Sequence, residues 1–197
     1  MTSKFSQSII LLFAILVPAA CQKLTSNRVA VDYYSISGNS TKSLDKQIRL
    51  KGPKINGGRH AVAVARIKII PNIKFRSTTG GCRVSKSKVN VDAKVTLPRW
   101  TGRRTASKKL GKAWDNIDRY TRMHEAVHVA IAFRFAQRME NALTNLRGAG
   151  NCDELRVKVG EIVTTYLENH DKTQRQFDAD EQRKLLAFTK SSRKKRS

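Results

Sequence analysis

The chain has few acidic residues. Its 15 aspartates and glutamates are set against 39 lysines and arginines, which gives a net charge of +24. Such a field favours anionic partners, either the surface of the cell envelope or nucleic acid. The basic residues are spread through every segment, however, without an aromatic-interleaved basic stripe or a nucleic-acid-binding motif. We therefore predict a solvated basic surface that could contact anionic envelope material, and no specific nucleic-acid partner.

Long apolar runs are almost absent. The clearest covers residues 9–17, follows Lys4 and precedes Pro18-Ala19-Ala20. It is too short to span a membrane, and its flanks are those of a secretory signal peptide. Residues 1–20 are thus predicted to be a signal peptide, which makes the protein periplasmic or secreted. Cys21 leaves a lipoprotein alternative open, although Pro18 stands where a lipobox normally carries leucine or valine.

Cysteine is scarce as well, with three in the whole chain. Only Cys82 and Cys152 lie well inside the mature protein. In an oxidising compartment two such cysteines pair more often than they bind metal. We predict a disulfide that ties the sheet to the helical half and contributes about 4 kcal/mol on the chain-entropy estimate.

Two of the four histidines belong to His124-Glu125-Ala126-Val127-His128, the HExxH pattern. On a helix, positions four apart share a face with a rise of about 6 Å, so both imidazoles can reach one small cation. Zinc peptidases use this spacing, with the glutamate as general base. Both histidines share one helix face with a stripe of apolar or small residues, which is expected to point inward. The stripe has spacings of three, four or seven and comprises Ala113, Ile117, Tyr120, Val127, Ile131, Phe135, Met139, Leu143 and Leu146. The pattern favours a metal site over two core histidines.

A catalytic zinc usually takes three protein ligands and keeps one position for water. The metzincin extension is excluded because Ile131 and Arg134 stand in place of its glycine and third histidine. The glutamate that gluzincins carry about twenty residues beyond the second histidine is replaced here by Gly148.

A second helical pattern begins after the turn at 147–151, and His170 lies on its apolar stripe. If the two helices fold back about residue 149, His128 lies opposite residue 170. We therefore predict His170 as the third ligand and keep Asp178 as the alternative. A nearby carboxylate, from Asp171 or Asp178, could also orient a ligand imidazole.

The N-terminal half reads as strands with one short helix. Polar side chains alternate with the apolar ones of the last strand, which indicates a sheet that is wet on one face and hence antiparallel. Two of the four prolines, Pro71 and Pro98, are predicted to end strands. The predicted elements are a strand over 29–35, a helix capped by Ser40 or Thr41 and ending at Leu50, strands over 61–70 and 89–97, and a long helix capped by Ser107.

These elements predict an α+β fold: a small antiparallel sheet followed by a long antiparallel helical hairpin that carries HExxH, as in zincins. A single domain covers residues 21–190. The basic tail, 191–197, is predicted to be disordered.

Several short motifs accompany HExxH along the chain: Tyr33-Tyr34, Gly57-Gly58-Arg59-His60, Cys82-Arg83-Val84 and Thr96-Leu97-Pro98-Arg99-Trp100. With these motifs the chain resembles a bacterial family, a domain formerly of unknown function, that is described as a predicted secreted zinc-dependent protease. The resemblance covers about residues 29–187 and implies an exported, zinc-binding peptidase with HExxH on a helix beyond a small sheet. Family members often end in Tyr-Asp and Thr-x-His-Gly, where this chain has Phe177-Asp178 and then Glu181 and Arg183.

The predicted function is a secreted zinc metallopeptidase that acts on peptide or protein substrates. His124, His128 and His170 would hold Zn²⁺, and Glu125 would act as general base. The alternative is a non-catalytic zinc-binding or polyanion-binding envelope protein, which is a degenerate protease. A structural zinc is normally closed by four protein ligands, so a three-histidine set favours the catalytic kind of site.

Overall fold

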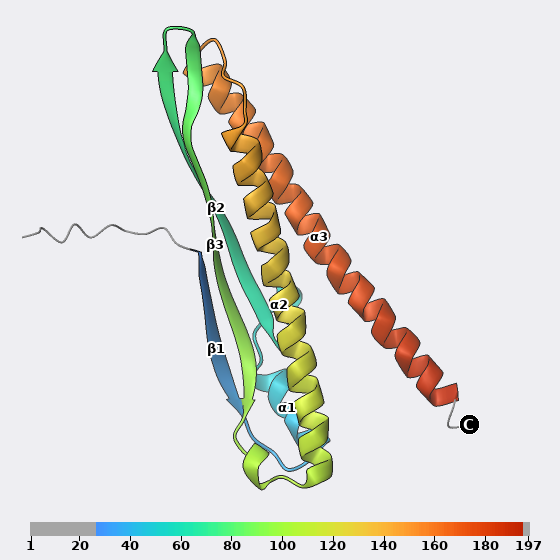
Figure 1. Cartoon of the computed structure of the whole chain (residues 1–197). Coiled ribbons are helices and arrows are strands. Elements are labelled where there is room, and N and C mark those ends of the chain that lie inside the picture. Colours follow the sequence, from blue (N-terminus) through green and yellow to red (C-terminus); the bar gives the residue numbers. More distant parts are fainter. Residues whose placement is uncertain (1–26, 195–197) are drawn as a thin grey trace, which may run out of the picture.

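The computed structural model describes residues 27–194, so the predicted signal peptide and Cys21 lie outside the described residues. No helix within 27–194 has the length and apolarity that a membrane crossing requires. The fold is α+β, as predicted (Figure 1). The elements in order are β1 (Arg28–Ile36), α1 (Thr41–Lys51), the 3₁₀ turn η1 (Asn56–Gly58), β2 (Val64–Thr78), β3 (Gly81–Trp100), the 3₁₀ turn η2 (Arg103–Thr105), α2 (Lys108–Thr144) and α3 (Cys152–Lys194).

The three strands form one mixed sheet in the order β1-β3-β2. β2 and β3 are antiparallel, as predicted, but β1 runs parallel to β3, so the prediction of a purely antiparallel sheet is wrong for β1. The polar positions of β3 alternate with core positions because the long helices α2 and α3 pack on one face of the sheet, and this alternation does not reveal strand direction. The chain leaves β1 through α1 and enters the sheet again at the opposite edge, as β2.

Both prolines that were predicted to end strands lie inside them. Pro71 lies on β2, which is an edge strand, and pairs with Val89 of β3. An edge strand needs ladder hydrogen bonds on only one side and therefore tolerates proline. Pro98 lies beyond the last β2–β3 pair, Val64 with Thr96, where β3 has β1 as its only neighbour.

The helices begin where their caps were predicted. The Ser40 side chain accepts a hydrogen bond from the Ser43 backbone at the start of α1, and Ser107 does the same for Leu110 at the start of α2. α3 continues to Lys194, into the start of the basic tail. Arginine and lysine are good helix formers, which accounts for this extension. Residues 195–197 lie outside the described residues.

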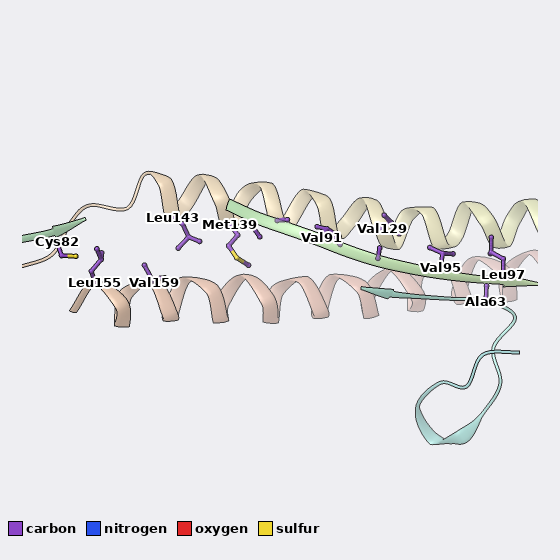
Figure 2. Packing of buried hydrophobic residues seen from close by; sticks show 14 residues of the cluster. Ala63, Cys82, Val91, Val95, Leu97, Val129, Met139, Leu143, Leu155 and Val159 are labelled. Atoms are coloured by element: carbon purple, nitrogen blue, oxygen red, sulfur yellow. The ribbon is translucent and has the colours of Figure 1, made fainter. Parts of the chain in front are cut away.

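The main core lies between the sheet and the helical hairpin (Figure 2). Alternate residues of β3, such as Val91, Val95 and Leu97, face α2, while Leu155 and Val159 of α3 close the core near the turn. Each fully buried aliphatic side chain contributes about 1.5–3 kcal/mol. This packing fixes α2 against β3 and thereby fixes the HExxH segment relative to the neighbouring strand β2.

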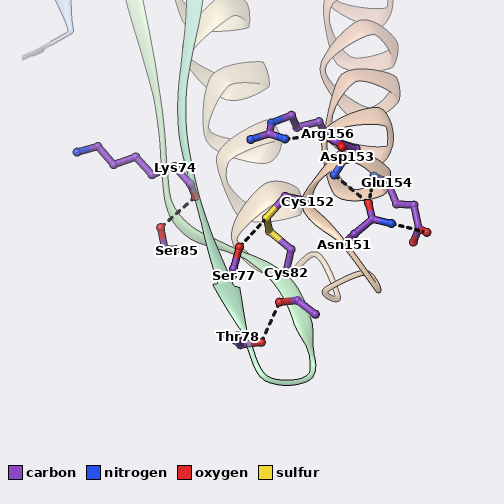
Figure 3. The surroundings of a disulfide bond; sticks show 11 residues. Lys74, Ser77, Thr78, Cys82, Ser85, Asn151, Cys152, Asp153, Glu154 and Arg156 are labelled. Carbon is purple, nitrogen blue, oxygen red and sulfur yellow. Dashed lines mark hydrogen bonds and ion pairs between the residues drawn. A yellow bond between two sulfur atoms is a disulfide. The ribbon is translucent and has the colours of Figure 1, made fainter.

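The predicted disulfide is present between Cys82 and Cys152 (Figure 3). The backbone of Cys82 also exchanges two hydrogen bonds with Ala149, of 2.8 and 2.9 Å, so the tip of the β2–β3 hairpin is joined to the α2–α3 turn. Gly81 has φ of +120°, and a Cβ there would meet the Ala149 carbonyl oxygen at 2.1 Å. This close approach requires glycine.

Candidate metal centre

Two helices bring three ligand-type side chains together. His124 and His128 lie one turn apart on α2, and Asp178 reaches them from α3. The Asp178 carboxylate oxygen lies 3.0 Å from Nε2 of His128 and 3.3 Å from Nε2 of His124, and the two Nε2 atoms are 3.1 Å apart. Ligand atoms about 2.0–2.1 Å from a tetrahedral zinc lie about 3.3 Å from one another. The three atoms therefore have the spacing of a zinc ligand set.

Gln174, on α3, determines which nitrogen of His128 carries a proton. Its Nε2 donates to the backbone carbonyl oxygen of His128 at 3.0 Å, and that oxygen can only accept. The amide oxygen of Gln174 must then accept from Nδ1 of His128, at 2.6 Å. Nε2 of a neutral His128 is thus left with a lone pair that faces the Asp178 carboxylate. An imidazole nitrogen and a carboxylate oxygen are donor types that zinc binds, so the donor set fits a metal ion.

His124 is suited to the same role. Burial, and then the neighbouring charge of His128, lower the pKa of His124 below its ordinary value, while Asp178 opposes the shift. Its Nδ1 is buried without a hydrogen-bond partner among residues 27–194, so protonation of both nitrogens would leave an unsatisfied N–H. Burial and the missing partner both favour the neutral ring. Phe177 packs against both imidazoles, with ring centroids 4.9 and 5.1 Å away, and holds their orientation.

His170, the predicted third ligand, lies outside this ligand set. The ring is buried, and its Nε2 accepts a hydrogen bond of 2.8 Å from Gln174. Its Nδ1 donates to Asp171 at 3.0 Å. A chain of hydrogen bonds thus runs from Asp171 through His170 and Gln174 to His128. The structure brings His170 to the site as a residue that orients Gln174, and it brings Asp178, the alternative, into contact with His124 and His128.

A small error in the predicted hairpin explains the difference. In the structure His128 contacts Gln174 and His124 contacts Asp178, so the two helices fold back about residue 151 rather than 149. A shift of two residues in the turn moves the facing residue by four, which is one helical turn. No role was predicted for Gln174 from the sequence. The available signal was the spacing of four that places His170, Gln174 and Asp178 on one face of α3.

Glu125 is buried between α2 and the sheet, at 5% exposure. Burial raises the pKa of its carboxyl group above the ordinary value, although the charge of His128 and a hydrogen bond from the Ala65 backbone oppose the shift. Glu125 lines the same cavity as His124 and His128 but does not belong to the ligand set. Its carboxylate is therefore available to accept a proton in the cleft.

The three ligand-type residues open into a cleft. A cavity of about 480 Å³ lies between α2, α3 and β2, with Ala63 and Ile67 on its strand side. A neighbouring cavity of about 380 Å³ also reaches His124 and Asp178. Its walls are mainly apolar and come from three parts of the chain, with Val62, Ile117, Tyr120 and Leu185 among the lining residues. The Tyr34 hydroxyl holds this wall in place by donating to the Val62 carbonyl oxygen at 2.7 Å.

Fold and site together define an α+β domain in which an HExxH helix and a second long helix converge beside the edge strand of a small sheet. The chain belongs to the family described as bacterial protein of unknown function (DUF922), whose sequence model matches residues 31–184. The match includes all the residues of the candidate site. No curated protein and no solved structure gave a significant match to the chain.

The position of His170 gives a first testable prediction. His170→Ala is expected to lower zinc affinity by about 10–100-fold, as is typical when a residue behind a ligand is removed, while one zinc per chain still binds at saturation. Competition against a chromophoric chelator measures the affinity. His60→Ala is the matched control, because the His60 ring bonds to the Gly52 carbonyl oxygen, away from the ligand set. Loss of stoichiometric zinc in His170→Ala alone would show that His170 is itself a ligand.

Proposed function

We propose that this protein is an exported zinc-dependent peptidase in which His124, His128 and Asp178 hold the metal and Glu125 is the general base. The observation that carries the proposal is the contact between Nε2 of His128 and the Asp178 carboxylate, 3.0 Å apart, with Nε2 of His124 beside both. This ligand set replaces the predicted set of three histidines.

The chemistry follows from the groups around the cleft. A zinc ion held by His124, His128 and Asp178 would lower the pKa of a bound water molecule to about 7. Glu125 lines the cavity and can take the proton from that water. Because burial already favours its protonated form, the carboxyl group can hold the proton and pass it to the leaving amine. Asp178 has the most exposed side chain of the proposed ligand set, so the cluster is most accessible to solvent on the side of Asp178.

The shape of the cleft supports a peptide substrate. Residues of β2 line it, and β2 is an edge strand, so an extended peptide could pair with its backbone. The adjoining cavity beside Ile117 and Leu185 would accept an apolar side chain next to the bond that is cleaved.

Zinc-dependent cleavage of a peptide library tests the proposal. Protein comprising residues 22–197, loaded with one equivalent of zinc, is incubated with mixed peptides, and products are identified by mass spectrometry. Cleavage that stops with a chelator and returns with added zinc is expected. Zinc binding without any cleavage would favour the second candidate, a non-catalytic zinc-binding envelope protein. The observation that favours this second candidate is the basic outer face of the sheet.

A further inference from the structure

The face of the sheet that points away from α2 and α3 is strongly basic. Exposed cations with this orientation occur on all three strands; Lys94 among them pairs with Asp32, and six others lie on β2 and near the β2–β3 turn. We call these six residues the outer basic face: Arg66, Lys68, Lys74, Arg76, Arg83 and Lys86. Within the described strands, this face carries two acidic residues, Asp32 and Asp92.

Like charges lie directly opposite each other on this face. Lys74 pairs with Lys86, and Arg76 with Arg83, on neighbouring strands. Within residues 27–194, none of these four side chains forms an ion pair with a carboxylate. The Lys74 side chain extends away from both helices (Figure 3). Opposed like charges destabilise a strand pair, so the folded state alone gives no reason for this arrangement.

A β-bulge brings the second pair into register. The pairing shifts between Lys74 and Phe75, and the shift places Arg83, rather than Val84, opposite Arg76. Val84 then faces Phe75 on the side of the helices, and both pack against the core. The bulge therefore keeps the inner face apolar and the outer face continuously basic.

We propose that the outer basic face docks the protein on an anionic phospholipid membrane. Outward side chains on one strand repeat about every 6.8 Å and neighbouring strands lie about 4.8 Å apart, so the cations form a two-dimensional array that suits many lipid headgroups at once. Ile70, 46% exposed, lies on the same face between Lys68 and Lys74 and presents an apolar side chain to the interface. This inference does not depend on the proposed peptidase activity.

The same face fits nucleic acid less well. The long helices α2 and α3 lie on the opposite side of the sheet, and α1 packs against the end of this face through Tyr34 and Ile36, so no described helix is free to enter a groove. The outward positions of β2 carry no aromatic side chain on which a base could stack. An array without stacking residues or an element for a groove matches headgroups better than bases.

Vesicle binding by two charge-matched variants tests this surface. Arg83→Glu/Lys86→Glu converts both like-charge pairs into opposite-charge pairs, so the strand pairing should not be weakened. Lys172→Glu/Arg175→Glu lowers the net charge equally on exposed positions of α3. The protein used comprises residues 22–197, which keep every described element and the whole core. The apolar run at 9–17 is left out because it would itself partition into lipid.

Binding is measured by co-sedimentation with phosphatidylcholine vesicles that contain phosphatidylglycerol. The parent is expected to bind these vesicles, to ignore pure phosphatidylcholine, and to bind less tightly as salt rises from about 50 to about 200 mM. Arg83→Glu/Lys86→Glu should weaken binding by roughly tenfold or more, and Lys172→Glu/Arg175→Glu by much less. Unfolding midpoints verify that both variants are folded.

Three results would overturn the proposal. Equal weakening by the two variants would mean that net charge, and not this face, attracts the protein. Equal binding to pure phosphatidylcholine would remove the electrostatic basis. In a competition experiment, a short duplex oligonucleotide and free anionic lipid are each added to the vesicle-bound parent. If the oligonucleotide displaces the parent at a lower concentration than the anionic lipid does, the face binds nucleic acid instead.

Discussion

Replacing Glu125 by glutamine is expected to abolish peptide cleavage while zinc binding and the fold remain. Glutamine keeps the size of the side chain but cannot accept the proton of the attacking water. General base catalysis contributes about 10²–10⁴-fold, so the rate constant for cleavage should fall by at least that lower factor. Zinc content should stay at one per chain because Glu125 lies outside the ligand set.

The same variant makes a prediction about stability. Burial raises the pKa of Glu125 above its ordinary value of 4.5, so the folded protein favours the protonated carboxyl group. In the metal-free protein, charging this group costs stability as the pH rises above 4.5. Glutamine does not ionise, so the variant should unfold at the same or a higher temperature at pH 7.

The control for Glu125→Gln is Glu161→Gln, an exposed position on α3 outside the cleft. It should retain full activity and an unchanged unfolding curve. If Glu125→Gln cleaves peptides at the parent rate, Glu125 is not the general base, whatever the metal content. If it loses zinc as well as activity, Glu125 contributes to the metal site directly.

Removing the disulfide is expected to give the largest loss of stability. The bond closes a loop with a sequence separation of 70 residues, for which the chain-entropy estimate is about 4 kcal/mol. Cys82→Ala/Cys152→Ala should therefore lower the free energy of unfolding by about that amount, as measured by urea denaturation. Reduction of the parent by a phosphine should shift its curve to nearly the same midpoint.

The metal site should survive this loss in the fraction of protein that stays folded. Asp178 lies 26 residues along α3 from Cys152, which is about 39 Å. The hydrogen bonds between Cys82 and Ala149 also remain to hold the hairpin tip. Zinc content of the folded double variant should thus equal that of the parent. A loss of less than about 1 kcal/mol in the free energy of unfolding would show that these backbone contacts, rather than the disulfide, join the sheet to the helices.

The helices could be predicted well because their signals are local. Ser40 and Ser107 mark helix starts through their own capping hydrogen bonds, and the spacing within HExxH fixes which side chains share a face. The disulfide was predictable as well, since only Cys82 and Cys152 remained to pair. Each of these inferences depends on a few neighbouring residues or on simple elimination.

The features that were missed depend on how distant segments align. The direction of β1 depends on the route of the chain through α1, which no residue of β1 reveals. The choice between His170 and Asp178 depended on the centre of a turn to within two residues. The opposed cations of the outer basic face became visible only with the register of β2 and β3, including the bulge after Lys74. In each case the local pattern was sound and the long-range alignment was undetermined.

Zinc stoichiometry tests the central claim most directly. Metal content is measured by mass spectrometry on the parent and on Asp178→Ala, with His170→Ala as the comparison, after dialysis against equal free zinc. One zinc per chain is expected in the parent, almost none in Asp178→Ala, and close to one in His170→Ala at saturating zinc. One zinc retained in Asp178→Ala but lost in His170→Ala, or none in the parent, would contradict a site formed by His124, His128 and Asp178.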